Sequence, residues 1–459
     1  MPISLLIVIL LALSSAAYYF GRRQAVSVVG GRVRELHSLP AYNGLYVALW
    51  CGLPALLVVA AWVSFEGGVI TQLVVAGLPQ ALTDQGPDQV TLVVNEIRNI
   101  ASGNVYGDPE PAVLAAAEHY KALKGTSHGA LIGLSLALAL GAGAFALKRI
   151  RPRLRARNSV EFVITGLLLA SSTLAVMTTV GIVLSVLFES IRFFQSVPIS
   201  EFLFGLEWSP QTAIRAEQVG SSGAFGAVPL FAGTMLIAFI AMLVAVPIGL
   251  MSAIYLSEYA SLRFRTIAKP LLEILAGVPT VVYGFFAALT VAPFIRDTGG
   301  LLGLDVASES ALAAGLVMGI MIIPFVSSLS DDVINAVPQA MRDGSYGIGA
   351  TRSETIKRVI FPAALPGIVG GVLLAVSRAI GETMIVVMAA GLAANLTANP
   401  LEAVTTVTVQ IVTLLVGDQE FDSPKTLAAF ALGLVLFVVT LFLNIIALYI
   451  VRKYREQYE

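Results

Sequence analysis

Long apolar runs alternate with polar segments along the whole chain, and nine of the runs are long enough to cross a membrane as helices. Each run holds few or no charged side chains, which is the pattern of a spanning helix. We therefore predict an all-α polytopic membrane protein. The runs lie near residues 3–20, 45–63, 130–147, 163–188, 229–255, 270–293, 311–329, 367–391 and 426–450.

Glycine or proline stands in the middle of several runs, where it can interrupt a regular helix. Within a membrane, such breaks are tolerated where neighbouring helices or a polar cavity satisfy the freed backbone groups. Small residues also let two helices pack closely, so the sequence leaves both explanations open. The positions are Pro247, Gly277 with Pro279, Pro324, and Gly370 with Gly371.

The first run could be a secretory signal peptide, because Ser14–Ala17 resembles a cleavage region. However, no basic residue precedes the run, and four arginines follow it within residues 21–35. We therefore expect a retained helix whose N-terminus lies outside. Between the second and third runs, residues 64–128 form a polar segment, and we predict a small separate helix there that opens at Asp108–Pro111, with Asp108 as its cap.

Composition agrees with a membrane protein, since 57% of the residues are hydrophobic, 12% are charged and the mean hydropathy is +0.85. The single cysteine, Cys51, excludes an internal disulfide, and the three histidines are too scattered for a metal site. No lysine stands in a phosphate-binding loop motif. We therefore expect no cofactor, no metal and no catalytic residue, with any ATP hydrolysis carried out by another subunit.

The positive charges fix a topology. Segments that nine spans place inside hold 20 of the 28 Lys and Arg, segments placed outside hold seven, and the remaining one is Arg378. The N-terminus then lies outside and the C-terminus inside, in the cytoplasm. The basic run 148–157 adjoins a span, so we interpret it as an inside flank that touches anionic membrane lipid, and we expect no nucleic acid as a partner.

The longest inside loop, residues 330–366, has the pattern of two short helices. One extends from about Pro338 toward Ile348, and Gly347 and Gly349 interrupt the chain after it. Thr351 and Glu354 form a T-x-x-E capping box that opens the second helix, which we expect to end before Pro362. A polar helix–turn–helix under a membrane bundle suits docking of a cytoplasmic partner, although an idle structured loop fits the same pattern.

The apolar run after this loop contains Arg378 and Glu382. Their spacing of four residues predicts that both lie on one face of a helix. An arginine inside a bundle marks either an anion path or a structural ion pair. Both explanations stay open from these residues alone.

The loop resembles the segment E-A-A-x3-G-x9-I-x-L-P with which ABC importer permeases dock on their ATPase. Here Asp343-Gly344-Ser345 precede Gly349 and Pro362 at the matching spacing, with Asp for Glu, Gly for the first Ala and Phe for the Leu. Arg378–Met384 is similar to the R-A-x-G-E-T segment of phosphate-specific ABC permeases, the C subunit of the Pst system. Further similar segments lie at 275–284, 320–324 and 345–351.

The resemblance covers roughly residues 160–459 and implies a type I (MetI-like) importer permease core of six transmembrane helices. Residues 158–459 would form this permease domain, with 330–366 as its cytoplasmic coupling loop, and residues 1–157 a three-helix extension with a periplasmic segment at 64–128. The implied substrate-path residues are Arg378, Glu382, Thr383, Thr280 and Tyr283, and the implied ATPase-coupling residues are Asp343, Gly344, Ser345, Gly349 and Pro362.

The implied function is the permease subunit of an ATP-driven bacterial phosphate importer in the inner membrane. Its implied partners are a second permease subunit in a heterodimer, a cytoplasmic ATPase dimer, a periplasmic phosphate-binding protein and inorganic phosphate. Two alternatives remain: a permease for another oxyanion, and a transporter subunit whose main role is to signal the phosphate supply.

Selectivity is a separate hypothesis. Monohydrogen phosphate keeps an O–H group, which an ionised Glu382 could accept, whereas sulfate has no proton to donate. A carboxylate beside Arg378 would then exclude sulfate by repulsion.

Overall fold

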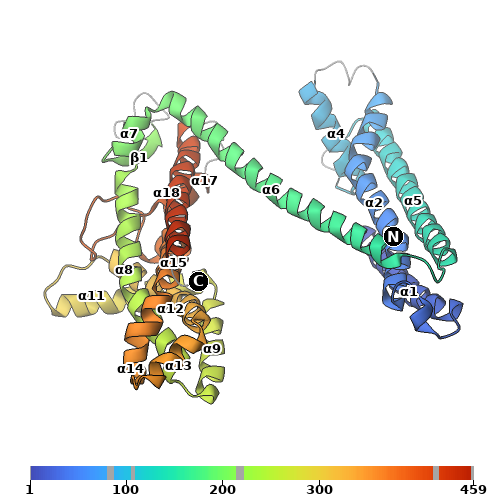
Figure 1. The fold of residues 1–459 in the computed structure, drawn as a ribbon. Helices are drawn as coiled ribbons and strands as arrows, with labels where there is room; N and C mark the ends of the chain where they lie inside the picture. The colour runs from blue at the N-terminus through green and yellow to red at the C-terminus, as the bar shows by residue number, and fades with distance from the viewer. Residues whose placement is uncertain (1, 80–86, 105–108, 213–221, 417–422, 456–459) are drawn as a thin grey trace. The chain divides into compact units, whose positions relative to one another are not determined.

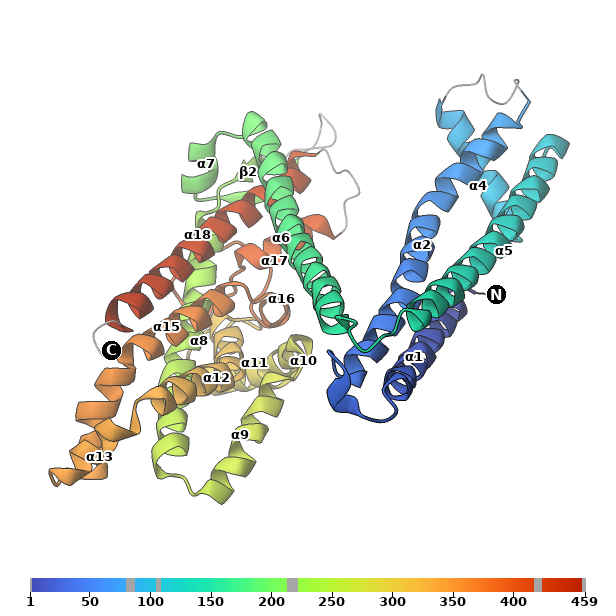
Figure 2. The same ribbon diagram turned by 45° about the vertical axis from the view of Figure 1, so that its right-hand side comes forward.

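The computed structural model describes residues 2–79, 87–104, 109–212, 222–416 and 423–455. Within these ranges, nine helices are long and apolar enough to cross a membrane, which confirms the predicted number of spans. The chain divides into two compact units, residues 1–177 and 178–459, here called the N-terminal and the C-terminal unit (Figures 1 and 2).

The N-terminal unit is a bundle of long, continuous helices. Helix α2 packs against both α1 and α5, and α4 packs against α5. Glycines let the backbones approach closely: a Cβ atom on Gly44 of α2 would lie 2.7 Å from the carbonyl oxygen of Tyr18 in α1. The elements are α1 (Ile3–Val28), η1 (Val33–Glu35), α2 (Pro40–Ala76), α4 (Pro87–Ala101), α5 (Pro111–Lys148) and the first part of α6 (Ala156–Ser196).

The small helix predicted to open at Asp108–Pro111 does begin there, but its predicted small size is wrong. Helix α5 begins at Pro111, where a proline without an N–H group suits the first turn, and it continues unbroken to Lys148. The expected cap Asp108 lies outside the described residues. Helix α4 was not foreseen, because its sequence is too polar to register as an apolar run.

The C-terminal unit is also mainly helical, with one hairpin. Strands β1 and β2 pair antiparallel, with Trp208 opposite Phe225, and the Trp208 indole donates to Gln410 of α17 at 3.0 Å. The elements are α7 (Ile199–Phe204), β1 (Trp208–Thr212), β2 (Ser222–Phe225), α8 (Val228–Ile254), η2 (Tyr255–Tyr259), α9 (Leu262–Ala276), α10 (Thr280–Phe286), η3 (Ala287–Val291), α11 (Ala292–Leu301), α12 (Ala311–Ala336), α13 (Gln339–Gly347), α14 (Arg352–Thr355), η4 (Ile356–Ile360), α15 (Phe361–Ile380), α16 (Met384–Ala389), α17 (Val407–Leu415) and α18 (Pro424–Arg455).

Helices α8 and α12 form the centre of this unit. They pack along their length, and Gly315 of α12 faces Ile240 of α8 so closely that an added Cβ would lie 2.7 Å from the isoleucine side chain. Pro247 and Pro324 stand inside these helices without ending them. The small-residue explanation also holds for Gly370 in α15, which faces Val451 of α18.

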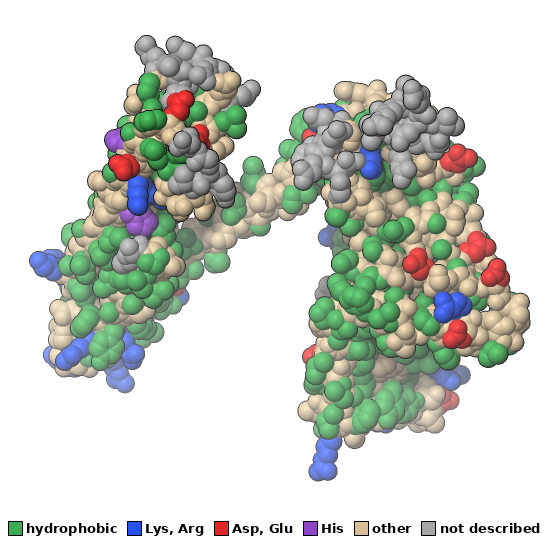
Figure 3. Space-filling model, turned by 180° about the vertical axis from the view of Figure 1, so that it is seen from behind, with side chains coloured by type: hydrophobic (Ala, Val, Ile, Leu, Met, Phe, Trp, Pro, Cys, Tyr) green, Lys and Arg blue, Asp and Glu red, His purple; other side chains and the backbone are tan. Residues whose placement is uncertain are grey.

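Two of the predicted spans are interrupted. The run 270–293 is divided by Gly277–Pro279 into α9 and α10, so this break is confirmed. The run 367–391 is divided at residues 381–383 into α15 and α16, which no proline or glycine pair announced. Hydrophobic side chains cover much of the face shown in Figure 3, as expected for a membrane protein.

The expected helix end before Pro362 is wrong. The chain remains helical from Arg352 through Ile380, with the π-turn η4 directly before α15. Proline has no N–H group to give to the helix, and its ring crowds the carbonyl four residues earlier. The wider π-turn relieves both the missing N–H group and the crowding, because it changes the hydrogen-bond spacing directly before Pro362.

Candidate functional site

The two interrupted spans meet at their breaks. Helices α10 and α16, which each follow a break, pack against one another. Gly284 of α10 faces α16 so closely that an added Cβ would lie 2.7 Å from the Met388 sulfur. Non-helical backbone at membrane depth is tolerated where it is buried in protein or lines a polar cavity. The breaks therefore indicate where such a cavity should be sought.

The expectation that Arg378 and Glu382 share one helix face is wrong. Helix α15 ends at Ile380, Gly381 caps it, and Glu382 lies in the break. The Glu382 carboxylate accepts a hydrogen bond from the backbone N–H of Met384 at 3.1 Å, and its carbonyl accepts one from Thr408 at 2.8 Å. Both residues are described, and no ion pair joins them. The structure therefore contains no Arg378–Glu382 ion pair.

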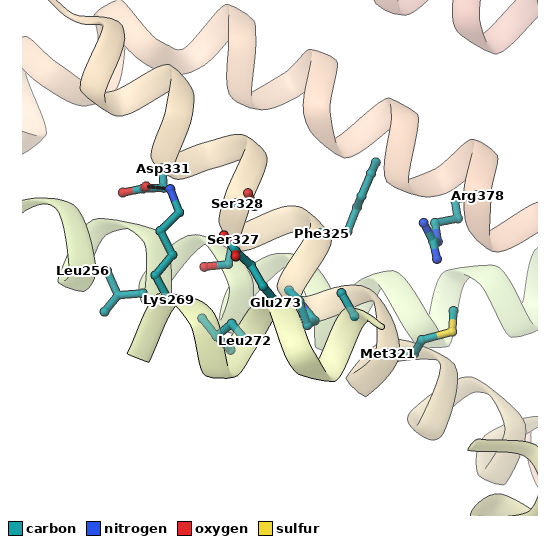
Figure 4. Close-up of a pocket in the computed structure, with 12 residues that line it drawn as sticks. Leu256, Lys269, Leu272, Glu273, Met321, Phe325, Ser327, Ser328, Asp331 and Arg378 are labelled. Atoms are coloured by element: carbon teal, nitrogen blue, oxygen red, sulfur yellow. Dashed lines mark hydrogen bonds and ion pairs between the residues drawn. The ribbon is translucent and has the colours of Figure 1, made fainter. Parts of the chain in front are cut away.

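A cavity of about 240 Å³ lies beside Arg378. Helices α9, α12 and α15 contribute its walls, with Leu256 of η2 at one side. Arg378 lies at one end, where its guanidinium carbon is 5.5 Å from the centroid of the Phe325 ring, a cation–π distance. Lys269 and Asp331 lie at the other end, and Glu273, Ser327 and Ser328 lie between (Figure 4).

Charge pairing fixes α9 against α12 at this cavity. Arg265 donates to both oxygens of Asp331 at 3.0 Å, and Lys269 donates to the same carboxylate at 2.9 Å. Asp331 is buried, with 4% of its side chain exposed. Its hydrogen bond raises the pKa of Lys269 above the ordinary value, so the ammonium stays charged at neutral pH.

Arg378 differs from these cations. Its side chain is exposed in this chain, and among the described residues it neither pairs with a carboxylate nor donates a hydrogen bond to a protein group. A guanidinium offers five fixed donors that suit bidentate contact with an oxyanion. Chemically, this end of the cavity can bind an anion.

The other expected path residues lie at the breaks. Thr280 is the first residue of α10, and Thr383 lies in the break before α16. Tyr283 is buried, with 7% exposed, and its hydroxyl donates to the carbonyl of Leu275 at 2.8 Å, across the break at 277–279. Tyr283 therefore holds the break in shape, and its hydroxyl already has a partner.

The inside loop has the predicted two-helix form. Helix α13 covers the expected segment, Gly349 adopts a φ of +87°, and Thr351 and Glu354 make the capping box. The Ser345 hydroxyl bonds that of Thr355 at 2.9 Å, which ties α13 to α14. Asp343 and Gly344 lie on α13, and Pro362 lies in the first turn of α15.

Two functional candidates in this loop escaped sequence reasoning. Ile348 is 87% exposed at the end of α13, an apolar side chain at the tip of a polar loop. Arg342 of α13 forms a buried ion pair with Glu258 of η2 and donates to the carbonyl of Ile334 in α12 at 2.7 Å. Only the three-dimensional fold brings Arg342 and Glu258 together, because 84 residues separate them in the sequence.

Within the described ranges, no group of His, Cys, Asp or Glu side chains could hold a metal ion. The helical fold and the two-helix loop are compatible with a permease of the binding-protein-dependent class, which the sequence comparisons establish. Residues 245–456 match the family model of the binding-protein-dependent transport system inner membrane component, and residues 7–178 match a second model described as phosphate ATP-binding cassette transporter.

Similar proteins identify the family within this class. It is 31% identical over 270 residues to the phosphate transport system permease protein PstC of Mesorhizobium japonicum. The aligned region covers 55% of this chain and 78% of that protein. It is 30% identical over 243 residues to the probable ABC transporter permease protein YqgH of Bacillus subtilis, covering 52% and 74%. The chain belongs to the PstC family of ABC transporter permeases and is a multi-pass inner-membrane protein.

One solved structure with a lower similarity is a bacterial alginate ABC transporter in complex with an alginate pentasaccharide-bound periplasmic protein. It is 15% identical, covers 65% of this chain and 96% of that one, and has a TM-score of 0.45. The family assignment rests on the sequence comparisons.

Proposed function

We propose that this chain, paired with a second, related permease subunit, forms the membrane path of an ATP-driven importer of inorganic phosphate. Its family and the PstC relatives support phosphate as the substrate. The observation that carries the proposal is the Arg378 guanidinium, which lies unpaired among the described residues at a cavity beside two broken spans. The remaining expected path residues, Thr280, Tyr283, Glu382 and Thr383, lie at or beside the two breaks.

Transport needs a source of energy, and the chain has no phosphate-binding loop of its own. ATP hydrolysis therefore belongs to a separate cytoplasmic ATPase dimer, which docks on the coupling loop, and a periplasmic phosphate-binding protein delivers the substrate. The exposed Ile348 suits an apolar pocket on the ATPase. The N-terminus is then periplasmic and the C-terminus cytoplasmic, as the distribution of Lys and Arg favours.

The coupling loop is connected to the bundle by Arg342. Its buried pair with Glu258 joins α13 to the end of α8, and its bond to the Ile334 carbonyl joins α13 to α12. A push on α13 would therefore move η2 and α12 with it, and α9 is held to α12 through Asp331. Motion of the ATPase would in this way reach the cavity.

The test is ATP-dependent uptake of radioactive phosphate into vesicles that contain the assembled complex. Arg378→Ala should lower uptake by about 100-fold or more, because a bidentate contact to a charged group is lost. Arg296→Ala is the matched control, since Arg296 is an exposed arginine of α11 paired with Asp297. Normal uptake by an assembled Arg378→Ala complex would refute the proposed path.

Competition by sulfate or molybdate tests the alternative that the importer takes other oxyanions. If either anion competes with phosphate for uptake as well as unlabelled phosphate does, the chain serves a general oxyanion importer.

A further inference from the structure

The cavity beside Arg378 holds a carboxylate that the family motif does not contain. Glu273 lies on α9 in register with Arg265 and Lys269, at steps of four residues, so the three side chains share one face of the helix. Arg265 and Lys269 bind Asp331 of α12, which fixes that face toward α12. Glu273 therefore lies one turn nearer the break, on the wall of the cavity that also contains Arg378 (Figure 4).

The two carboxylates near the breaks differ in their partners. Glu382 turns back onto its own chain and accepts the N–H of Met384 at 3.1 Å. Glu273 makes no hydrogen bond or ion pair with any described residue. An ionised carboxylate has two oxygens that only accept hydrogen bonds. Glu273 is thus an unused acceptor in the cavity where the anion binds.

Two hydroxyls of α12 complete this wall. Ser327 is 2% exposed and lines the cavity with Ser328, and among the described residues neither hydroxyl has a hydrogen-bond partner. Buried helix hydroxyls elsewhere, such as those of Ser135 and Thr234, donate to the carbonyl four residues earlier. Because the Ser327 hydroxyl is not used in such a bond and lines the cavity, it is available to donate to a ligand there.

We propose that Glu273, rather than Glu382, makes the site selective for an oxyanion that carries a proton. The inference rests on the proposed function and deepens it. Arg378 and the hydroxyls of Ser327 and Ser328 donate to the phosphate oxygens, and Glu273 accepts the O–H of monohydrogen phosphate. Sulfate offers no O–H at neutral pH, so its oxygens meet the carboxylate directly and are repelled.

The periplasmic binding protein would filter anions before they reach this site, so the test leaves it out. The permease–ATPase complex is purified without the binding protein, and its thermal unfolding is followed with inorganic phosphate or sulfate at equal ionic strength. A ligand that binds only the folded complex raises the unfolding temperature. The wild-type complex should respond to phosphate at concentrations about 10- to 100-fold below those of sulfate.

Glu273→Gln should bring the sulfate response to within a few-fold of the phosphate response, because the amide can donate as well as accept. Glu161→Gln, which changes an exposed carboxylate of the N-terminal unit, is the matched control and should discriminate as the wild type does. Glu382→Gln tests the rival carboxylate. If Glu273→Gln still rejects sulfate, or if only Glu382→Gln admits it, the inference is wrong and the proposed function stands. If phosphate does not stabilise the wild-type complex, the proposed anion site itself fails.

A second measurement needs no substitution. Monofluorophosphate has nearly the shape and charge of monohydrogen phosphate, but fluorine replaces the hydroxyl. The wild-type complex should reject it as it rejects sulfate, and Glu273→Gln should admit it. Equal stabilisation of the wild type by phosphate and monofluorophosphate would overturn the role of Glu273 in sensing the proton.

Discussion

The two units of this chain use helices in opposite ways. In the N-terminal unit, α1, α2 and α5 are single continuous helices of 26, 37 and 38 residues. In the C-terminal unit, three helical segments contain π-turns, namely η2, η3 and η4, and two spans are broken at residues 277–279 and 381–383. Irregular backbone within a membrane must be satisfied by other groups, and the two breaks lie directly beside the candidate spans Thr280–Leu301 and Arg352–Ile380.

Charge follows the same division. The ion pairs of the N-terminal unit are exposed, as between Arg157 and Glu161, with 62% and 48% of the side chains accessible. The C-terminal unit buries Asp331 and largely buries the pair Glu258–Arg342. Buried charges cost free energy unless they are paired. The comparison shows that, among the described residues, the irregular backbone and the most deeply buried charge of the chain lie in the C-terminal unit.

The largest difference between the two units should come from substitutions of glycines whose backbone lies in the left-handed region. Gly349 in the coupling loop and Gly31 in the N-terminal unit have φ values of +87° and +84°, and a Cβ on either meets open space. Leucine at either position strains the backbone equally. Gly349→Leu should reduce ATP-dependent phosphate uptake at least about tenfold, because it disturbs the ATPase docking surface. A tenfold loss corresponds to about 1.4 kcal/mol of free energy.

Gly31→Leu should leave uptake within about twofold of wild type, since its strain costs only about 1 to 2 kcal/mol of local stability. Co-purification of the ATPase and uptake are measured for both variants. Normal uptake by Gly349→Leu with the ATPase still bound would count against a docking role for this loop.

A smaller contrast concerns stability. Asp331→Ala removes the buried carboxylate that Arg265 and Lys269 share and, among the described residues, leaves Lys269 only Asp332 at 3.7 Å. We expect it to destabilise the C-terminal unit by about 2 kcal/mol, because both cations are partly exposed. Glu161→Ala removes one partner of an exposed pair and should cost at most about 1 kcal/mol. Thermal unfolding of the two purified variants gives the comparison, and equal effects would contradict it.

The smallest effect on transport is expected from removing the extension. A chain that starts near Arg149 should still insert, assemble and transport. Its stability should fall, because Ile150, Ala156 and Val160 belong to the core of the N-terminal unit and would lose their partners. Uptake and the unfolding temperature are measured side by side. Loss of uptake despite normal assembly would mean that the extension takes part in transport.

Local signals in the sequence were sufficient for much of the fold. The nine apolar runs and the Thr351–Glu354 capping box are each decided by neighbouring residues, and both are confirmed. Gly277 and Pro279 likewise marked a true break. The division of function between residues 1–157 and 158–459 stays a prediction, since the compact units meet within α6.

The site depended on contacts that no local pattern reveals. Helix α15 ends at Ile380, so Glu382 does not lie on its face. The only sequence signal for this helix end was a glycine followed by polar residues. The position of Glu273 depends on the pairing of α9 with Asp331, more than 60 residues away in the sequence. The Pro362 prediction failed because a π-turn, which has no sequence signature of its own, absorbed the proline.

The central claim is that phosphate occupies the cavity between α9, α12 and α15. Cys51 is the only cysteine in the sequence, so Cys51→Ala with Ser328→Cys places a single thiol on the cavity wall, and Cys51→Ala with Ser64→Cys places one in the N-terminal unit as a control. Labelling by a cationic thiol reagent is timed with and without inorganic phosphate. The account predicts that phosphate slows labelling at 328 several-fold and leaves 64 unchanged, whereas equal labelling rates at 328 would contradict it.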